Sequence, residues 1–262
     1  MTRTAPGVCT SFAVPAEGYD LLMGRYLGTL APAFADAAGV RADMRALDVG
    51  CGPGGLTREL VTRLGADAVA AIDPSPPFVE ACRARNPGVD VRAGVAEELP
   101  FPGDVFDGAL ASLVVGFMSD ADSGVREMAR VTKPGGVVAA CFWDYRHMPV
   151  LHTFWAAAAA VDPSRTGEVT RLGGRQGDIA ALLSQAGLSD VVETTITARA
   201  NYAGFDDWWS PFPLGVGPAG AYSRSLPEDH REALRQTCHE LLGRPTGPFT
   251  LAASAWCARG TV

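Results

Sequence analysis

The chain has few charged residues and does not cluster them. Asp, Glu, Lys and Arg make up only 19% of its 262 residues, the net charge is −7, and no run of Lys or Arg offsets it. Such a surface repels phosphate backbones, so we expect no nucleic-acid partner. No apolar segment is long enough to span a bilayer, and the first seven residues lack the apolar core of a secretory signal. These absences predict a soluble, cytoplasmic protein that does not insert into membranes.

The spacing of metal ligands and of paired cysteines is also missing. The six cysteines form no C-x-x-C motif, and the four histidines lie at no spacing typical of a metal site. We therefore expect reduced, mostly buried thiols and no bound metal. What the chain does have is apolar side chains, at 47% of its residues. That content suffices for the core of one globular domain.

Apolar runs and helical segments alternate through the first half of the chain. Short strands are predicted at residues 45–49, 68–72, 89–93, 106–113 and 137–143. Helices are predicted between them at residues 54–64, 76–85 and 122–131, and a tight turn at 133–136. This alternation predicts an α/β fold in which helices cover both faces of a mostly parallel sheet.

The pattern changes outside this core. One or two helices are predicted across residues 19–38, a helix at 179–186 and two late strands at 191–198 and 249–258. Between these strands lies a stretch rich in aromatic residues, Gly and Pro, with a helix at 227–242. We predict a single domain spanning residues 1–262, composed of N-terminal helices (1–40), a cofactor-binding core (41–145) and a C-terminal part (146–262) with a small cap at 200–247.

The sequence LDVGCGPGG at residues 47–55 is the most informative motif. Glycines are needed where a strand turns sharply into a helix and the backbone approaches a ligand closely. The glycines at 50, 52 and 55 also satisfy G-x-G-x-x-G, and Asp73 lies 21 residues beyond Gly52. This spacing matches the ribose-binding acid of an NAD enzyme, so the loop alone leaves two ligand classes open.

The residues around the loop separate these two classes. Asp48 carries a negative charge beside the loop, which would repel a pyrophosphate but suits a ligand with an ammonium and a sulfonium. Residues 93–102 and the turn at 133–136 have no counterpart in a dinucleotide fold. The pattern therefore favours S-adenosylmethionine over NAD.

Together these motifs resemble class I S-adenosylmethionine-dependent methyltransferases of the ubiquinone/menaquinone-type (methyltransferase type 11-like) group, most strongly over residues 45–143. The resemblance implies a Rossmann-like, seven-stranded sheet whose last, antiparallel strand inserts between two parallel ones. It also implies S-adenosyl-L-methionine as cofactor and S-adenosyl-L-homocysteine as product.

Matching positions imply a cofactor site. Asp73 would accept hydrogen bonds from both ribose hydroxyls, and Asp48 would lie near the methionine ammonium. Many relatives have Asp where this chain has Val95, so adenine binding should differ here. The implied cofactor-binding residues are Tyr19, Asp48, Gly50, Cys51, Gly52, Asp73, Pro74, Ser75, Ala96, Glu97, Ser112 and Leu113.

Catalytic and substrate residues are less well defined by sequence. His147, just after the fifth strand, is the candidate general base, although a solvent-exposed loop histidine is an alternative. Tyr145 and Arg146 beside it are candidates for contacting a polar substrate group. Trp208 and Trp209 would bind an apolar or aromatic substrate, or else form a hydrophobic plug between cap and sheet. The expected methyl acceptor is a small, partly apolar molecule, and the atom methylated stays open.

Two other functions remain possible at this point. The chain could bind S-adenosylmethionine without methyl transfer, as a regulator or a rearrangement catalyst. It could also be an NAD-dependent oxidoreductase. We expect a monomer or a homodimer in either case.

Overall fold

A seven-stranded sheet forms the centre of this computed structural model, which describes residues 16–164 and 171–262. The strand order is β3-β2-β1-β4-β5-β7-β6. Neighbours from β3 through β5 are parallel, whereas β7 runs antiparallel to both β5 and β6. This order confirms the Rossmann-like sheet with an inserted last strand. The strands are β1 Ala46–Val49, β2 Val69–Asp73, β3 Asp90–Ala93, β4 Phe106–Ser112, β5 Thr132–Trp143, β6 Ser189–Tyr202 and β7 Phe249–Thr261.

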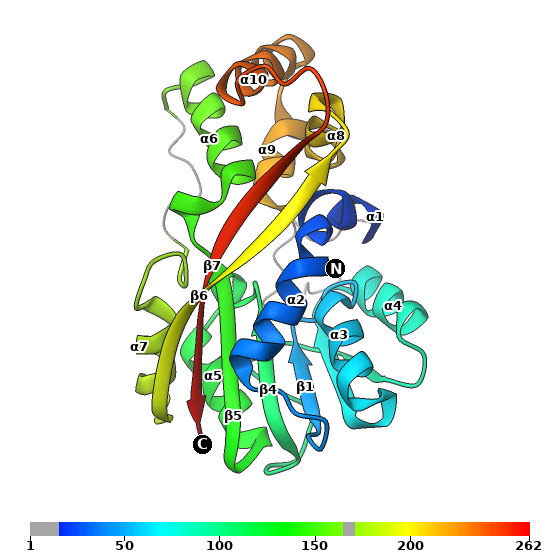
Figure 1. The fold of residues 1–262 in the computed structure, drawn as a ribbon, viewed down its shortest axis with the longest axis vertical. Helices are drawn as coiled ribbons and strands as arrows, with labels where there is room; N and C mark the ends of the chain where they lie inside the picture. Colours follow the sequence, from blue (N-terminus) through cyan, green and yellow to red (C-terminus); the bar gives the residue numbers. More distant parts are fainter. Residues whose placement is uncertain (1–15, 165–170) are drawn as a thin grey trace, which may run out of the picture.

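Helices cover both faces of the sheet (Figure 1). Successive strand residues point to opposite faces, so Ala46 packs in one cluster with Leu60 of α3, while Leu47 packs in another with Val125 of α5 and Ile179 of α7. The helices are α1 Ala16–Tyr19, α2 Arg25–Ala38, α3 Gly55–Leu64, α4 Pro76–Arg85, α5 Ala121–Val131, α6 Pro149–Val161, α7 Asp178–Gln185, α8 Phe205–Trp209, α9 Gly217–Ser225 and α10 Glu228–Leu241.

The N-terminal helical segment is continuous through a π-helical turn. This turn, Asp20–Gly24, joins α1 to α2, and α2 accommodates Pro32 in its interior. Tyr26 and Phe34 of α2 are fully buried, and α2 packs along β6. The segment thereby brings residues near the chain's start to the carboxyl ends of the parallel strands.

The cap surrounds the ends of β6 and β7 that project beyond the sheet (Figure 1). It contains α8, α9 and α10, and also α6, which precedes the stretch expected to form the cap. α6 packs against α10, and Phe154 of α6 stacks on Phe212 at a centroid distance of 4.4 Å. Because α6 is almost wholly apolar, it has no polar stripe from which its helical period could be read.

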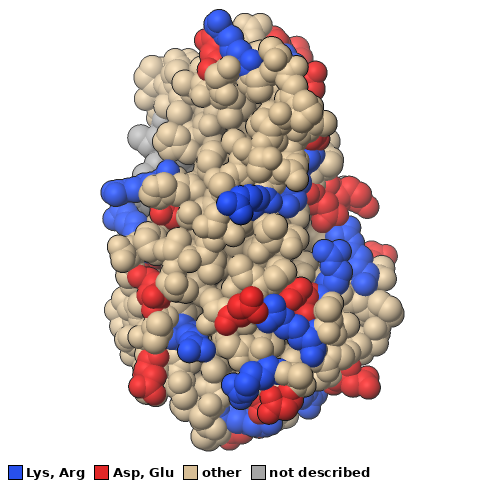
Figure 2. All heavy atoms as spheres, viewed as in Figure 1, with Lys and Arg blue, Asp and Glu red and all other residues tan. Residues whose placement is uncertain are grey.

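The expected turn at residues 133–136 is an irregularity within β5. Pairing with β4 runs from Phe106↔Thr132 directly to Gly108↔Val137, and Gly135 has a left-handed φ of 78°. Among the described residues, no helix combines the length and apolar character needed to cross a bilayer. Figure 2 shows Lys and Arg interspersed with Asp and Glu on the face drawn there.

Candidate functional site

The loop after β1 is held against the end of β2. The backbone N–H groups of Gly50 and Cys51 both donate to Ile72 O, at 2.8 and 3.0 Å. Gly50 has a φ of +73°, and a Cβ placed on it would lie 2.4 Å from a methyl carbon of Val114. Only glycine therefore fits this position, both for its conformation and for the close approach of the segment after β4.

Asp73, the last residue of β2, connects this loop to the start of α4. One carboxylate oxygen accepts the N–H of Gly52 and the other accepts the N–H of Ser75, each at 2.8 Å. The side chain is only 6% exposed, and burial raises the pKa of Asp73 to about 6 despite these two bonds. Each carboxylate oxygen retains a further lone pair for a ligand.

Asp48 lies in the centre of β1, beneath the loop, and is fully buried. One of its oxygens accepts a 2.7 Å hydrogen bond from the Thr57 hydroxyl of α3, while the other has no partner within the described residues. Burial raises the pKa of Asp48 to about 7. Asp48 does not line the cavity described next, so its side chain makes no direct contact with that space.

A cavity opens at the carboxyl ends of the parallel strands, where ligands of such sheets bind. It contains ten of the twelve implied cofactor-binding residues, and Asp48 and Cys51 are the two that do not line it. The ten are Tyr19, Gly50, Gly52, Asp73, Pro74, Ser75, Ala96, Glu97, Ser112 and Leu113.

Cys51 points away from the cavity, into a small cluster with Cys82 of α4. Both thiols are free and buried. A hydrogen bond between them lowers the pKa of Cys82 and raises that of Cys51, and Cys82 also contacts the Thr57 hydroxyl at 3.6 Å. The loop therefore rests on a small buried cluster that contains both thiols, and Cys51 is not part of the described cavity lining.

Glu97 fixes one wall of the cavity. Its carboxylate accepts the N–H groups of Ser119 and Asp120 at 2.7 and 3.1 Å, which anchors the start of α5. Leu113, at the end of β4, has an unusual positive φ of 63° and donates its N–H to Cys141 O. Such strained backbone is concentrated at ligand sites.

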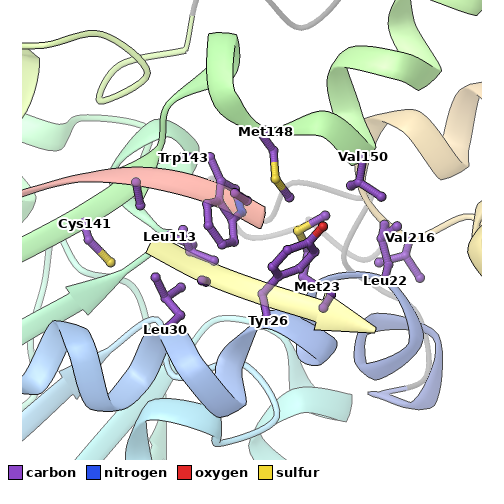
Figure 3. Packing of buried hydrophobic residues seen from close by; sticks show 14 of the residues in the cluster. Leu22, Met23, Tyr26, Leu30, Leu113, Cys141, Trp143, Met148, Val150 and Val216 are labelled. Carbon is purple, nitrogen blue, oxygen red and sulfur yellow. The ribbon is translucent and has the colours of Figure 1, made fainter. Parts of the chain in front are cut away.

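Most of the other side chains that line the cavity are apolar. They come from the N-terminal helical segment, from the segments after β4 and β5, and from the start of α9 in the cap. Figure 3 shows two of them, Leu22 and Met23, in the core cluster that also contains Tyr26, Trp143, Met148, Val150 and Val216. The lining residues not anticipated from sequence include Leu22, Met23, Phe117, Met118, Trp143, Leu151 and Val216.

Only one of the three candidate catalytic or substrate-binding residues after β5 lines the cavity. Tyr145 lines the cavity, whereas Arg146 and His147 are exposed and do not. The His147 side chain is 68% exposed, and its Nδ1 lies 2.7 Å from Asp144 Oδ2. The short helical turn Tyr145–His147 thus directs only its first side chain inward.

Trp208 and Trp209 lie in the core of the cap and not along the cavity. Trp208 is fully buried beside Phe205 and Phe212, with ring centroids 5.7 and 5.0 Å away. Trp209 stacks on Phe154 and is 7% exposed. This packing corresponds to the hydrophobic plug, one of the two roles predicted for these tryptophans.

The described cavity lining contains few ionisable side chains, namely Tyr19, Asp73, Glu97 and Tyr145. Burial, followed by the nearby charge of Asp73, raises the pKa of Tyr19 far above its ordinary value. Tyr19 is therefore a neutral hydroxyl, and its ring packs edge-on against Phe78 at 5.5 Å.

Comparison with known proteins shows which proteins the central part of the chain is similar to. Residues 47–140 match the family described as a methyltransferase domain. Over 121 residues the chain is 36% identical to 2-methyl-6-phytyl-1,4-hydroquinone methyltransferase 2, chloroplastic, of Oryza sativa subsp. japonica, an alignment that covers 45% of this chain and 33% of that protein. It is 39% identical over 99 residues to the ubiquinone biosynthesis O-methyltransferase of Rhizobium etli, covering 36% of this chain and 39% of that one.

The chain thus aligns with less than half the length of the curated relatives it matches. Among solved structures, the YcgJ protein of Bacillus subtilis superposes over 91% of this chain and 98% of its own, with a TM-score of 0.54 and 21% identity, which shows a shared fold. The matched segment runs from the glycine-rich loop through most of β5, and it carries the strand ends that build the cavity. Residues 47–140 of this chain therefore match the methyltransferase domain family, and the strand order is that of a Rossmann-like sheet with an inserted antiparallel strand.

Proposed function

We propose that the chain is an enzyme that transfers a methyl group from S-adenosylmethionine to a small, apolar or aromatic molecule. The observation that carries the proposal is the position of Asp73, whose two oxygens are fixed by Gly52 and Ser75 at the edge of the cavity. A carboxylate held by two backbone donors is preorganised to accept a pair of vicinal ribose hydroxyls.

The electrostatics of the site fit a cationic nucleoside. Asp48 and Asp73 place two carboxyl groups beside the glycine-rich loop, and no Lys or Arg is among the described residues that line the cavity. The unpartnered Asp48 oxygen is suited to an ammonium group reached through a water molecule or the backbone. The negative charge of Asp48 beneath the loop would repel a pyrophosphate placed there, so it disfavours a dinucleotide.

The residues present would hold the cofactor in a defined way. Gly50 and Gly52 would pass beneath its methionine part, Asp73 would bind its ribose, and Ala96 with Glu97 would border its adenine. When bound, the sulfonium supplies an already activated methyl group. The chain's own contribution would then be to align the acceptor and exclude water, for which the apolar side chains of the cavity lining are suited.

The lining favours an acceptor that needs little help to lose its proton. Of the three candidates after β5, Tyr145 lines the cavity and His147 is outside the described lining, so the proposal does not depend on His147 as a base. A phenol, a thiol or a stabilised carbanion meets this condition. The hydroquinone named for the rice relative is an acceptor of this kind, which supports the proposed class.

Product formation distinguishes methyl transfer from cofactor binding alone. The full chain is incubated with S-adenosylmethionine and a panel of phenols, quinols and thiols, and S-adenosylhomocysteine is quantified. We expect release above the acceptor-free rate with at least one apolar phenol or quinol, and slower release from Asp73→Asn when S-adenosylmethionine is subsaturating. Cofactor binding without release for any acceptor or for a small-molecule extract would favour the non-methylating alternative.

The proposal extends to location and assembly. All five cysteines within the described ranges are free thiols, which suits a reducing compartment such as the cytoplasm. The acceptor is a small molecule, and we propose a monomer or a homodimer without a nucleic-acid partner. Analytical ultracentrifugation across protein concentrations tests the assembly state directly.

A further inference from the structure

Two ion pairs hold the N-terminal helical segment beside the cavity, one at each end of the π-helical turn Asp20–Gly24. Asp20, the first residue of the turn, accepts two hydrogen bonds from the Arg85 guanidinium of α4, at 3.1 and 2.7 Å. Arg25, the first residue after the turn, makes an equivalent two-bonded pair with Asp207 of α8 in the cap. Figure 1 shows α1, which leads into the turn, between α4 and the cap. The segment is therefore attached to α4 on one side and to the cap on the other.

This segment forms one wall of the cavity. Tyr19, Leu22 and Met23 all line it. The Tyr19 ring packs edge-on against Phe78 of α4 at a centroid distance of 5.5 Å. Burial, and then the charge of Asp73, raises the pKa of Tyr19, so this ring lies within electrostatic range of the carboxylate proposed to bind the ribose. π-helical turns are rare and occur frequently at functional sites, which fits a turn placed at this wall.

The two ion pairs differ in how firmly they are held. The side chains of Arg25 and Asp207 are 17% and 30% exposed, and Asp207 also accepts the Ala203 N–H at 2.9 Å. The side chains of Arg85 and Asp20 are 39% and 41% exposed, and they form no further hydrogen bond among the described residues. Exposed ion pairs contribute little free energy and are screened by salt. The Asp20–Arg85 pair is therefore the one that opens more easily.

We propose that Arg85 is a positioning residue for the cofactor that acts through Asp20. Their ion pair holds the π-helical turn at the side of the cavity that contains Asp73, and its separation lets the nucleoside enter and leave. This inference rests on the proposed function and adds a contact that controls the rate of cofactor exchange. Neither Arg85 nor Asp20 lines the cavity, so the effect of replacing them reports on the turn and not on a lost contact with the ligand.

The release rate of S-adenosylhomocysteine tests the inference. Release from the immobilised full chain is followed by surface plasmon resonance at about 0.05 M and about 0.5 M salt. Wild type is compared with Arg85→Gln, with Asp20→Asn and with the variant that carries both changes. At low salt we expect each single variant to release the ligand roughly two- to fivefold faster than wild type, the range for one exposed ion pair. The double variant should be no faster than either single one, because both substitutions remove the same contact.

Salt and a second ion pair separate this role from a general effect of charge. The release rates of wild type and Arg85→Gln should converge at high salt, since salt screens the pair only where it is present. Asp90→Asn is the control, because Asp90 pairs with Arg92 at the same distance of 2.7 Å and with similar exposure, and neither residue lines the cavity. It should release the ligand as wild type does. Combining Asp20→Arg with Arg85→Asp restores a pair of reversed polarity and should slow release again.

Equal release rates for wild type and Arg85→Gln at low salt would overturn the inference. Additive effects of Asp20→Asn and Arg85→Gln would also overturn it, as would an equal acceleration in Asp90→Asn or a reversed pair that releases as fast as the single variants. Calorimetry with wild type keeps the two claims apart. The absence of S-adenosylhomocysteine binding there would contradict the proposed function, whereas binding with an unchanged release rate in Arg85→Gln would contradict only the role of Arg85.

Discussion

Gly52 donates its backbone N–H to a carboxylate oxygen of Asp73 at 2.8 Å, so the loop after β1 and the end of β2 form one rigid edge of the cavity. The second oxygen of Asp73 is held by Ser75 at the same distance. Two neighbouring parallel strands thereby present a single carboxylate with both oxygens fixed. A ligand that binds across this edge loses little entropy in ordering the protein.

Replacing Asp73 by Asn tests this edge. The amide has one acceptor oxygen, while the backbone offers two donors, so one N–H must face an NH₂ group. We expect the affinity for S-adenosylhomocysteine to fall roughly tenfold to a hundredfold, the range for losing a hydrogen bond to a charged group. Asp67→Asn, at an exposed position beyond α3, is the control and should bind as wild type does in calorimetry.

Gly50→Ala should destabilise the fold through a steric clash. The new Cβ would lie 2.4 Å from a side-chain carbon of Val114. The alanine would also have to adopt a left-handed backbone conformation. Gly187→Ala imposes a left-handed residue with no atom within 4 Å, so it measures the conformational cost alone. Denaturant unfolding should show a loss of about 1–2 kcal/mol for Gly187→Ala and about 1–3 kcal/mol more for Gly50→Ala. Equal losses would show that the loop moves freely away from Val114.

The ionisation of Asp48 should make stability depend on pH. Because burial raises the pKa of Asp48 from 3.8 to about 7, its ionised form is disfavoured in the folded state, and the free energy of unfolding falls as pH rises through this interval. Asp48→Asn lacks this titration and keeps an acceptor for Thr57.

Unfolding of wild type and Asp48→Asn is therefore compared at about pH 5 and about pH 8. Relative to wild type, Asp48→Asn should gain about 1–3 kcal/mol between the two conditions while binding S-adenosylhomocysteine more weakly. A difference in unfolding free energy that stays constant with pH would mean that Asp48 ionises normally in the folded chain.

The cap tryptophans should matter for stability. Trp209 packs against Phe154 and Phe212, so Trp209→Ala should cost about 3–5 kcal/mol of unfolding free energy. Leu214→Ala, at an exposed side chain of the same cap, should cost less than about 0.5 kcal/mol. Folded Trp209→Ala should keep wild-type affinity for S-adenosylhomocysteine, and a selective loss of ligand binding without a loss of stability would place Trp209 at the site after all.

Much of the fold could be predicted from periodicity because the parallel strands are short, apolar and separated by turn residues. The helix at 76–85 was predicted with its exact bounds, since Pro76 marks its start. α6 and α9 could not be delimited, because α6 is apolar on all sides and α9 is short and rich in Gly and Ser. Their positions depend on packing between segments far apart in the chain.

Some residues of the candidate site could be predicted from the sequence, and others could not. Residues at strand ends, such as Asp73 and Ser112, could be placed because the sheet topology brings all those ends together. Trp143 and Val216 line the cavity through tertiary contacts that no local pattern encodes. The aromatic density around Trp209 indicated burial, and sequence alone could not distinguish a cavity wall from a packed core.

Calorimetric titration of the wild-type chain with S-adenosylhomocysteine and with NADH, under the same conditions, tests the central claim most directly. The arrangement of Asp48, Asp73 and the glycine-rich loop predicts saturable, micromolar-range binding of the nucleoside thioether and no binding of the dinucleotide. Saturable binding of NADH together with no heat from S-adenosylhomocysteine would contradict the account.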